Sequence, residues 1–134
     1  MAVTALSTDM RNEMLDILLD EFDTGSTNAQ GRIEIRSSGG TLLATILMGN
    51  PAFDSAGSAG GNADGVGAAE TMTADSSADN NGTAAVAHFL DRDENILFKG
   101  VVGTSGQEVN LNTTSITAGQ NVALSAGTIT MPDA

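Results

Sequence analysis

The stretch Ala84-Ala-Val-Ala-His-Phe-Leu-Asp-Arg-Asp-Glu-Asn-Ile-Leu-Phe-Lys-Gly-Val-Val102 decides the fold class of this chain. Its two apolar-rich runs, 84–90 and 96–102, are separated by the charged and polar residues 91–95. Two strand-like runs around a short polar segment predict a β-hairpin with a charged turn.

The residues after this hairpin continue the same pattern toward the C-terminus. Turn sequences recur at 103–106 and 117–120, and apolar and polar side chains alternate between and after them. Pro132 ends the last predicted strand, because proline cannot donate a hydrogen bond to a strand ladder. Several short strands at this spacing predict a mainly β chain, folded as an antiparallel β-sandwich or jelly-roll-like domain or as a small barrel.

Two further strands and one segment that is hard to assign precede the hairpin. Isoleucines alternate with charged residues in 32–36, and the run 41–48 is apolar on both faces, as in a strand buried on both sides. Residues 54–82 are rich in Gly, Ala, Ser, Asp and Asn. Either part of this segment, such as 68–74, is an edge strand, or the segment is an extended arm that becomes ordered on a neighbouring subunit.

One N-terminal α-helix is predicted over residues 8–23. Ser7 or Thr8 can cap its first turn, and Gly25 can end it. Residues 1–6 precede it as a short N-terminal arm. Helical spacing places on one face the apolar side chains that we expect to pack against the rest of the domain, namely Met10, Met14, Ile17, Leu18 and Phe22, with Leu15 and Leu19 widening that face.

Length, charge and composition bound the class of protein. The 134 residues correspond to a single domain, 1–134, and the lack of cysteine excludes disulfides and thiolate metal sites. Seventeen acidic residues against five basic ones give a net charge of −12, which disfavours nucleic acid and anionic membranes as partners. We expect no signal peptide, because no basic, apolar, small-residue pattern opens the chain.

A possible cation site lies in the hairpin turn. Asp91, Asp93 and Asn95 have the D-x-D-x-N spacing of a calcium loop, but Ile96 and Val102 stand where an EF-hand needs Gly and Glu. An EF-hand is therefore excluded. A weaker cation site at this turn stays open beside the simpler interpretation, a solvated hairpin tip.

His88 is the only histidine, and it lies in the middle of a predicted strand. A catalytic histidine needs a nucleophile and an orienting acid, and no sequence signature marks either one. We interpret His88 as a structural residue or one at a subunit contact. We expect no enzymatic activity, no metal ligands and no cofactor.

Several segments together resemble a family of small structural proteins of tailed bacteriophages. The resemblance covers most of the chain, is weakest at residues 54–70, and is carried by turn and strand sequences and by the opening helix. These sequences are Gly40-Thr-Leu-Leu-Ala-Thr45, Ala74-Asp-Ser-Ser-Ala78, Phe89-Leu-Asp-Arg-Asp93, Ile96 to Val102, Gly103-Thr-Ser-Gly106, Leu111-Asn-Thr-Thr-Ser-Ile-Thr-Ala-Gly119 and Thr128-Ile-Thr-Met-Pro132.

The resemblance implies a virion protein, and we expect a capsid decoration (cement) protein on the head surface. It implies assembly in the bacterial cytoplasm, the major capsid protein as partner, and a homotrimer or other homo-oligomer. The residues expected to contact the capsid or another subunit are Met1, Ala2, Val3, Thr4, Ala5 and Leu6 of the arm, together with Val66 and Met72.

Three other functions compete with this interpretation. The first is a tail, fibre or baseplate component of the same virion. The second is a cation- or carbohydrate-binding adhesive module, although the lack of Trp and Tyr counts against sugar stacking, which needs aromatic faces. The third is a small hydrolase, which the isolated His88 disfavours.

Overall fold

The prediction of a mainly β chain with one N-terminal α-helix is confirmed. The computed structural model describes residues 5–125 and 127–131. In chain order its elements are α1 (Thr8–Glu21), β1 (Arg32–Ser37), β2 (Leu42–Met48), the 3₁₀ turn η1 (Gly57–Gly60), β3 (Val66–Ala68), β4 (Met72–Thr73), β5 (Gly82–Leu90), β6 (Ile96–Gly103), β7 (Val109–Asn110), β8 (Ser115–Ile116) and β9 (Thr128–Thr130).

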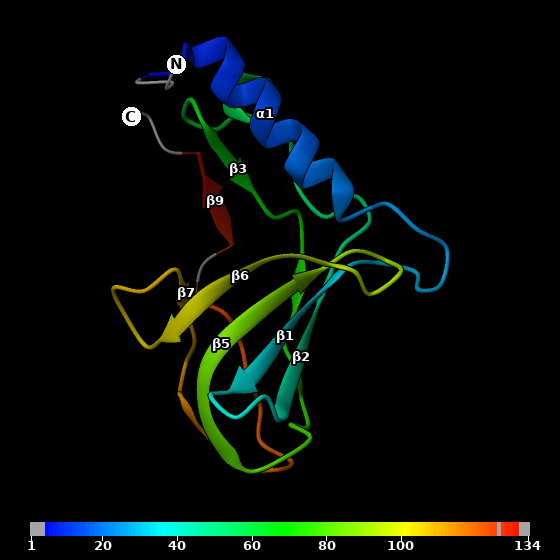
Figure 1. Cartoon of the computed structure of the whole chain (residues 1–134), viewed down its shortest axis with the longest axis vertical. Coiled ribbons are helices and arrows are strands. Elements are labelled where there is room, and N and C mark those ends of the chain that lie inside the picture. The colour runs from blue at the N-terminus through cyan, green and yellow to red at the C-terminus, as the bar shows by residue number, and fades with distance from the viewer. Residues whose placement is uncertain (1–4, 126, 132–134) are drawn as a thin grey trace.

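The largest unit is a curled seven-stranded sheet, the main sheet, with the strand order β4-β2-β1-β5-β6-β7 and with β8 paired to β5 (Figure 1). The predicted hairpin is confirmed as the antiparallel pair β5–β6. The sheet is mixed, because β7 runs parallel to β6 after the chain loops back over residues 104–108. This curled sheet is roughly consistent with the sandwich expected from the sequence.

Strand register divides the main sheet into an inner and an outer face. Ile33 pairs with Ile46 on one side and with Phe89 on the other, and Phe89 pairs with Phe98. Ile33 and Ile46 are fully buried, so this row forms the centre of the inner face. Side chains alternate along a strand, so the charged residues of β1 lie on the outer face.

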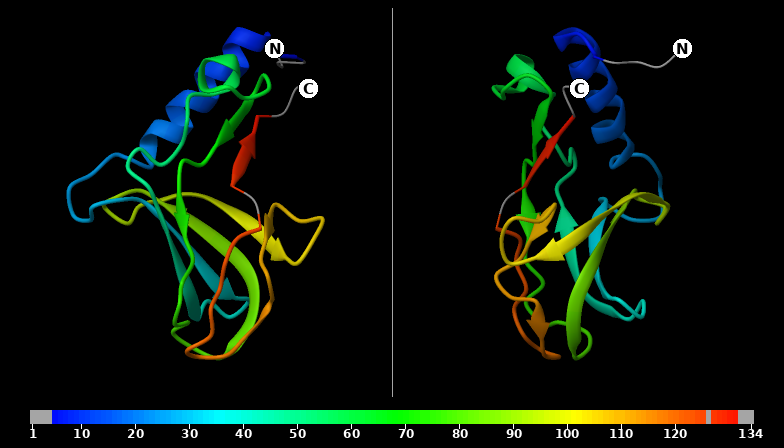
Figure 2. Two further views of the ribbon diagram at one scale, coloured as in Figure 1. Left: turned by 180° about the vertical axis from the view of Figure 1, so that it is seen from behind. Right: turned by 60° about the vertical axis from the view of Figure 1, so that its left-hand side comes forward.

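The second unit is a two-stranded antiparallel ribbon of β3 and β9, in which Gly67 pairs with Ile129. Figure 2 shows α1 running along this ribbon, beyond one end of the main sheet. Arg11 near the start of α1 donates a hydrogen bond of 3.0 Å from Nη2 to the carbonyl of Met131, just after β9. The first and last described elements of the chain are therefore held together.

The predicted apolar face of the helix is wrong at three of its five positions. Phe22, which directly follows α1, is buried and Leu18 is half-buried, but Met10, Met14 and Ile17 are 45%, 42% and 67% exposed. The side chains buried within α1 are Leu15 and Leu19. The helix begins as predicted, with Ser7 Oγ accepting a hydrogen bond from the N–H of Met10, and it ends at Glu21 rather than at residue 23.

Polar side chains of α1 explain which face turns inward. Asn12 Oδ1 accepts a hydrogen bond of 2.7 Å from the N–H of Gly65, and Asp16 Oδ1 accepts one of 2.6 Å from the N–H of Ala56. Both residues extend the face that carries Leu15 and Leu19. They satisfy backbone groups of a segment with little other secondary structure, which fixes the rotation of the helix.

Residues 54–82 fold against the domain and supply η1, β3 and β4. The N–H of Asp54 donates to the carbonyl of Ala68, and the N–H of Glu70 donates to the carbonyl of Ala52. β4 pairs with β2 and forms one edge of the main sheet. The described part of the chain contains no helix long and apolar enough to cross a membrane.

Candidate functional site

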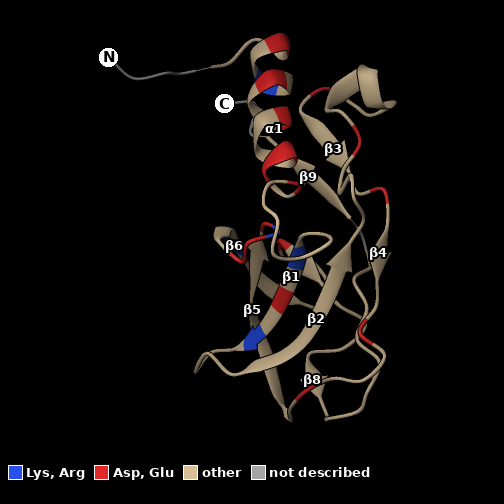
Figure 3. Ribbon diagram, turned by 90° about the vertical axis from the view of Figure 1, so that its right-hand side faces the viewer, with Lys and Arg blue, Asp and Glu red and all other residues tan. Residues whose placement is uncertain are grey.

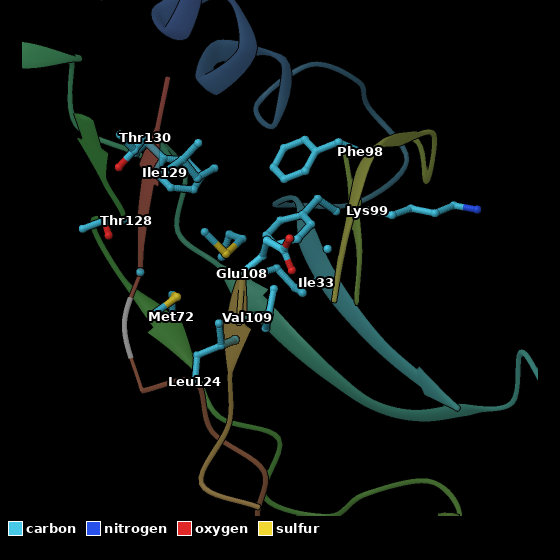
Figure 4. Close-up of a pocket in the computed structure, with 15 residues that line it drawn as sticks. Ile33, Met72, Phe98, Lys99, Glu108, Val109, Leu124, Thr128, Ile129 and Thr130 are labelled. Atoms are coloured by element: carbon cyan, nitrogen blue, oxygen red, sulfur yellow. The ribbon is translucent and has the colours of Figure 1, made fainter. Parts of the chain in front are cut away.

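An apolar cleft of about 360 Å³ lies between the inner face of the main sheet and β9 (Figure 4). Ile129 of β9 points into it from one side and Phe98 of β6 from the other. Its volume is near the lower end of the range for small-molecule sites. The lining residues are Ile33, Met48, Phe53, Met72, Phe89, Phe98, Lys99, Gly100, Glu108, Val109, Leu124, Gly127, Thr128, Ile129 and Thr130.

The four phenylalanines of the chain form one cluster beside this cleft. Phe89 and Phe98 are stacked, with ring centroids 4.2 Å apart and an interplanar angle of 17°. Phe22 packs against Phe53 at 5.0 Å and meets Phe98 edge to face at 5.9 Å. Three of these rings line the cleft, and their faces and edges suit contact with an aliphatic or aromatic group.

The charged groups around the cleft do not point into it as a catalytic pair. The Lys99 side chain points away from the cleft in Figure 4. Glu108 is exposed, and its Oε2 accepts a hydrogen bond of 3.1 Å from the N–H of Val101 on the edge of β6. The cleft can therefore bind an apolar group by shape and burial.

The structure places one predicted contact residue, Val66, on the β3–β9 ribbon and another, Met72, on β4 at the edge of the main sheet. Met72 lines the cleft, and Val66 pairs with Thr130 on β9; both side chains are half-buried. Ala5 is exposed and Leu6 is half-buried. Met1, Ala2, Val3 and Thr4 lie outside the described residues. The contact role of all eight residues stays a prediction.

Sequence reasoning did not identify most of the cleft. The alternation after the hairpin predicts strands around Val109, Leu124 and Ile129. Nothing in the local sequence shows that these side chains converge with Phe98. The alternation around Ile129 is the one local indication that its side chain faces inward, because it places Ile129 on the opposite face of the strand from its neighbouring threonines.

The two carboxylates of the possible cation site are engaged by the protein itself. Asp91 is buried, and its carboxylate accepts hydrogen bonds of 2.9 Å from the N–H of Asp93 and from the N–H and Nδ2 of Asn95. Asp93 Oδ1 accepts bonds of 2.8 Å from the N–H groups of Ser26 and Thr27, which lower the pKa of Asp93. Among the described residues no group of three His, Cys, Asp or Glu side chains is placed to hold a metal ion.

His88 lies on the outer face of the main sheet, paired with Glu34 of β1 and Lys99 of β6. Partial burial lowers the pKa of His88, the nearby cations Lys99 and Arg36 lower it further, and Glu34 opposes them. His88 therefore sits among charged neighbours on the outer face of the sheet, whereas the cleft lies on the inner face.

Comparison with known proteins found no match to the chain among protein-family models, curated proteins or solved structures.

Proposed function

We propose that this chain is a capsid decoration (cement) protein of a tailed bacteriophage, which binds the outer head shell and bridges neighbouring capsid subunits. The turn and strand sequences that resemble phage structural proteins support this location. The proposal places the chain on the virion surface as a homotrimer or other homo-oligomer, with the major capsid protein as its partner. It assigns no enzymatic activity.

The observation that carries a binding function is the apolar cleft beside the β3–β9 ribbon. A pocket lined by Phe89, Phe98 and Ile129 suits a large apolar side chain of a partner. Anchors of this kind supply most of the energy of a protein–protein interface, because they are fully desolvated and closely packed. Many copies on one shell make individually weak contacts sufficient.

The location is tested by electron cryomicroscopy of virions from the phage that encodes the chain. Decoration predicts density in hundreds of copies over the head surface. Density confined to the tail, in a few copies, would favour a tail, fibre or baseplate component instead. Absence of the protein from virions would refute both assignments.

The role of the cleft is tested with two variants of adjacent residues on β9. Ile129→Trp places a large ring in the cleft. Thr130 also borders the cleft, but its side chain is exposed and points away from the cleft in Figure 4, so Thr130→Trp places the same ring on the opposite side of the strand. We expect Ile129→Trp to lose binding to heads that lack the protein, and Thr130→Trp to retain it. Equal binding by two folded variants would show that the cleft is not the contact site.

A further inference from the structure

The charges of this acidic chain are unevenly distributed between α1 and the main sheet. Strands β1, β2, β5 and β6 together carry Arg32, Arg36 and Lys99 but a single acid, Glu34, in a chain of net charge −12. Helix α1 carries five acids and one base. Figure 3 shows this separation, with acidic positions along α1 and basic positions on β1.

The basic residues share the outer face of the main sheet with exposed apolar side chains. The register pairs Arg32 with Leu47, and His88 with Lys99. Leu47 is 37% exposed and Val101, two residues beyond Lys99, is 51% exposed. Arg36 forms an ion pair with Glu34, and Arg32 forms one with Glu94 at 3.5 Å, which leaves Lys99 as the exposed cation of this face among the described residues. A surface that combines apolar and basic side chains is typical of a protein interface.

The exposed side of α1 has the complementary character. Met10, Met14 and Ile17 follow the i, i+4, i+7 spacing and form one continuous strip, the α1 ridge. Glu13 and Asp20 are exposed and lie along one side of this ridge. Arg11 is directed elsewhere, to the carbonyl of Met131. The ridge is therefore an apolar strip with an acidic border.

These two surfaces do not cover one another within a single chain. Helix α1 packs along the β3–β9 ribbon through Leu15 and Leu19, which leaves both the ridge and the outer face of the main sheet open (Figure 2). Of the six large apolar side chains that are exposed among the described residues, three lie on the ridge and two, Leu47 and Val101, on the outer face.

We infer that the α1 ridge of one copy packs on the outer face of the main sheet of a second copy. The apolar residues form the centre of this contact, and the acids beside the ridge meet Lys99 at its border. The second copy is the occupant that the chain itself identifies, since it carries both complementary surfaces. Because the surfaces differ, the contact is made twice across a two-fold axis, repeats around a closed ring, or continues as an open filament.

This inference deepens the homo-oligomer part of the proposed function and does not require the capsid. It is tested by sedimentation equilibrium of the purified full chain at low and high salt. We expect a mass above the monomer that falls as salt rises, because the charged border is screened. Ile17→Ser, in the centre of the ridge, and Lys99→Glu, on the outer face, should each weaken association about tenfold or more.

Asp79→Lys is the matched control. Asp79 is an exposed acid that belongs to neither the α1 ridge nor the outer face, so reversing its charge should leave the association unchanged. Thermal melting checks that each variant is folded. A monomeric wild type at high protein concentration would overturn the inference, as would an oligomer that both Ile17→Ser and Lys99→Glu leave intact. Monomers that still decorate heads would overturn this contact and the homo-oligomer part of the proposed function but leave the capsid location standing, whereas oligomers absent from virions would overturn the capsid location and leave this contact standing.

Discussion

Leu19 of α1 lies directly over Gly67 of β3, so close that a Cβ atom at position 67 would overlap the Leu19 side chain. Leu19 is only 2% exposed, and its surroundings leave it little room to move. The glycine therefore sets the distance between the helix and the ribbon, and part of the glycine-rich segment 54–82 serves as the packing surface of α1.

Gly67→Ala should destabilise the protein by about 1–3 kcal/mol, the usual cost of adding a methyl group to a well-packed site. The measurement is the free energy of unfolding in urea. Gly39→Ala is the control, because a Cβ there would have its nearest neighbour at 3.9 Å. Equal stability of the two variants would mean that α1 does not pack on β3 as described.

Asp16→Ala should lower stability by about 1–2 kcal/mol and should make residues 54–65 more sensitive to proteases. The substitution removes the acceptor for the N–H of Ala56, a buried residue, and unpaired buried donors are costly. Glu13→Ala, on the exposed side of the same helix, should change the stability of the folded chain by less than about 0.5 kcal/mol. Cleavage kinetics that do not distinguish the variants would contradict the proposed rotation of α1.

Asp91→Ala should reduce the free energy of unfolding by about 1–3 kcal/mol, because the hairpin turn loses an acceptor of three hydrogen bonds. Asp79→Ala removes an exposed carboxylate and serves as the control in the same urea titration. A neutral effect of Asp91→Ala would show that the turn is held by other contacts.

Calcium should leave the melting temperature unchanged. The carboxylates of Asp91 and Asp93 are already occupied by N–H donors of the protein, and cation binding would have to displace them. The comparison is thermal unfolding with excess calcium and with a chelator. A reproducible rise in melting temperature with calcium would contradict this prediction and would support the cation site that the D-x-D-x-N spacing indicates.

Asp93 should contribute a stabilisation that disappears in acid. Hydrogen bonds from Ser26 and Thr27 hold the pKa of Asp93 below the ordinary value of 3.8. A carboxyl with a lowered pKa in the folded state stabilises the fold fully above pH 3.8, and this stabilisation is lost as the pH falls through the folded-state pKa. Asp93→Asn keeps an acceptor oxygen but does not titrate.

The melting temperatures of wild type and Asp93→Asn should therefore differ at pH 6, and this difference should shrink as the pH is lowered below the ordinary aspartate pKa of 3.8. A melting-temperature difference that does not change with pH would show that Asp93→Asn acts through the shape and hydrogen bonding of the new amide rather than through the lost charge.

Local alternation was sufficient to predict the β-class and the central hairpin. Residues 84–102 encode both strands and their turn within one short segment, so no distant contact was needed to recognise them. The strands expected around Val122 and Leu124 are reduced to isolated pairs with Asp75 and Leu111, because the partners lie in irregular segments that the sequence does not reveal.

The orientation of α1 could not be predicted from its apolar residues alone. Two overlapping apolar strips are available on the helix, and Asn12 and Asp16 select between them through hydrogen bonds to residues 53 and 40 positions away. The cleft was hidden for the same reason, since its walls come from strands between Ile33 and Thr130. Long-range pairing, such as Val66 with Thr130, has no local signature.

The hydrogen bond from Arg11 to Met131 joins residues 120 positions apart and has a consequence for synthesis on the ribosome. Helix α1 is translated first, but the ribbon on which it packs is complete only when β9 has been added. Until then β3 lacks its pairing strand and Arg11 lacks the carbonyl of Met131, although Leu19 can already pack on Gly67. A chain cut before residue 128 would keep Gly67 beneath Leu19 but would lose β9 and the Arg11–Met131 hydrogen bond, so we expect α1 to be held by half of its ribbon and to open more easily.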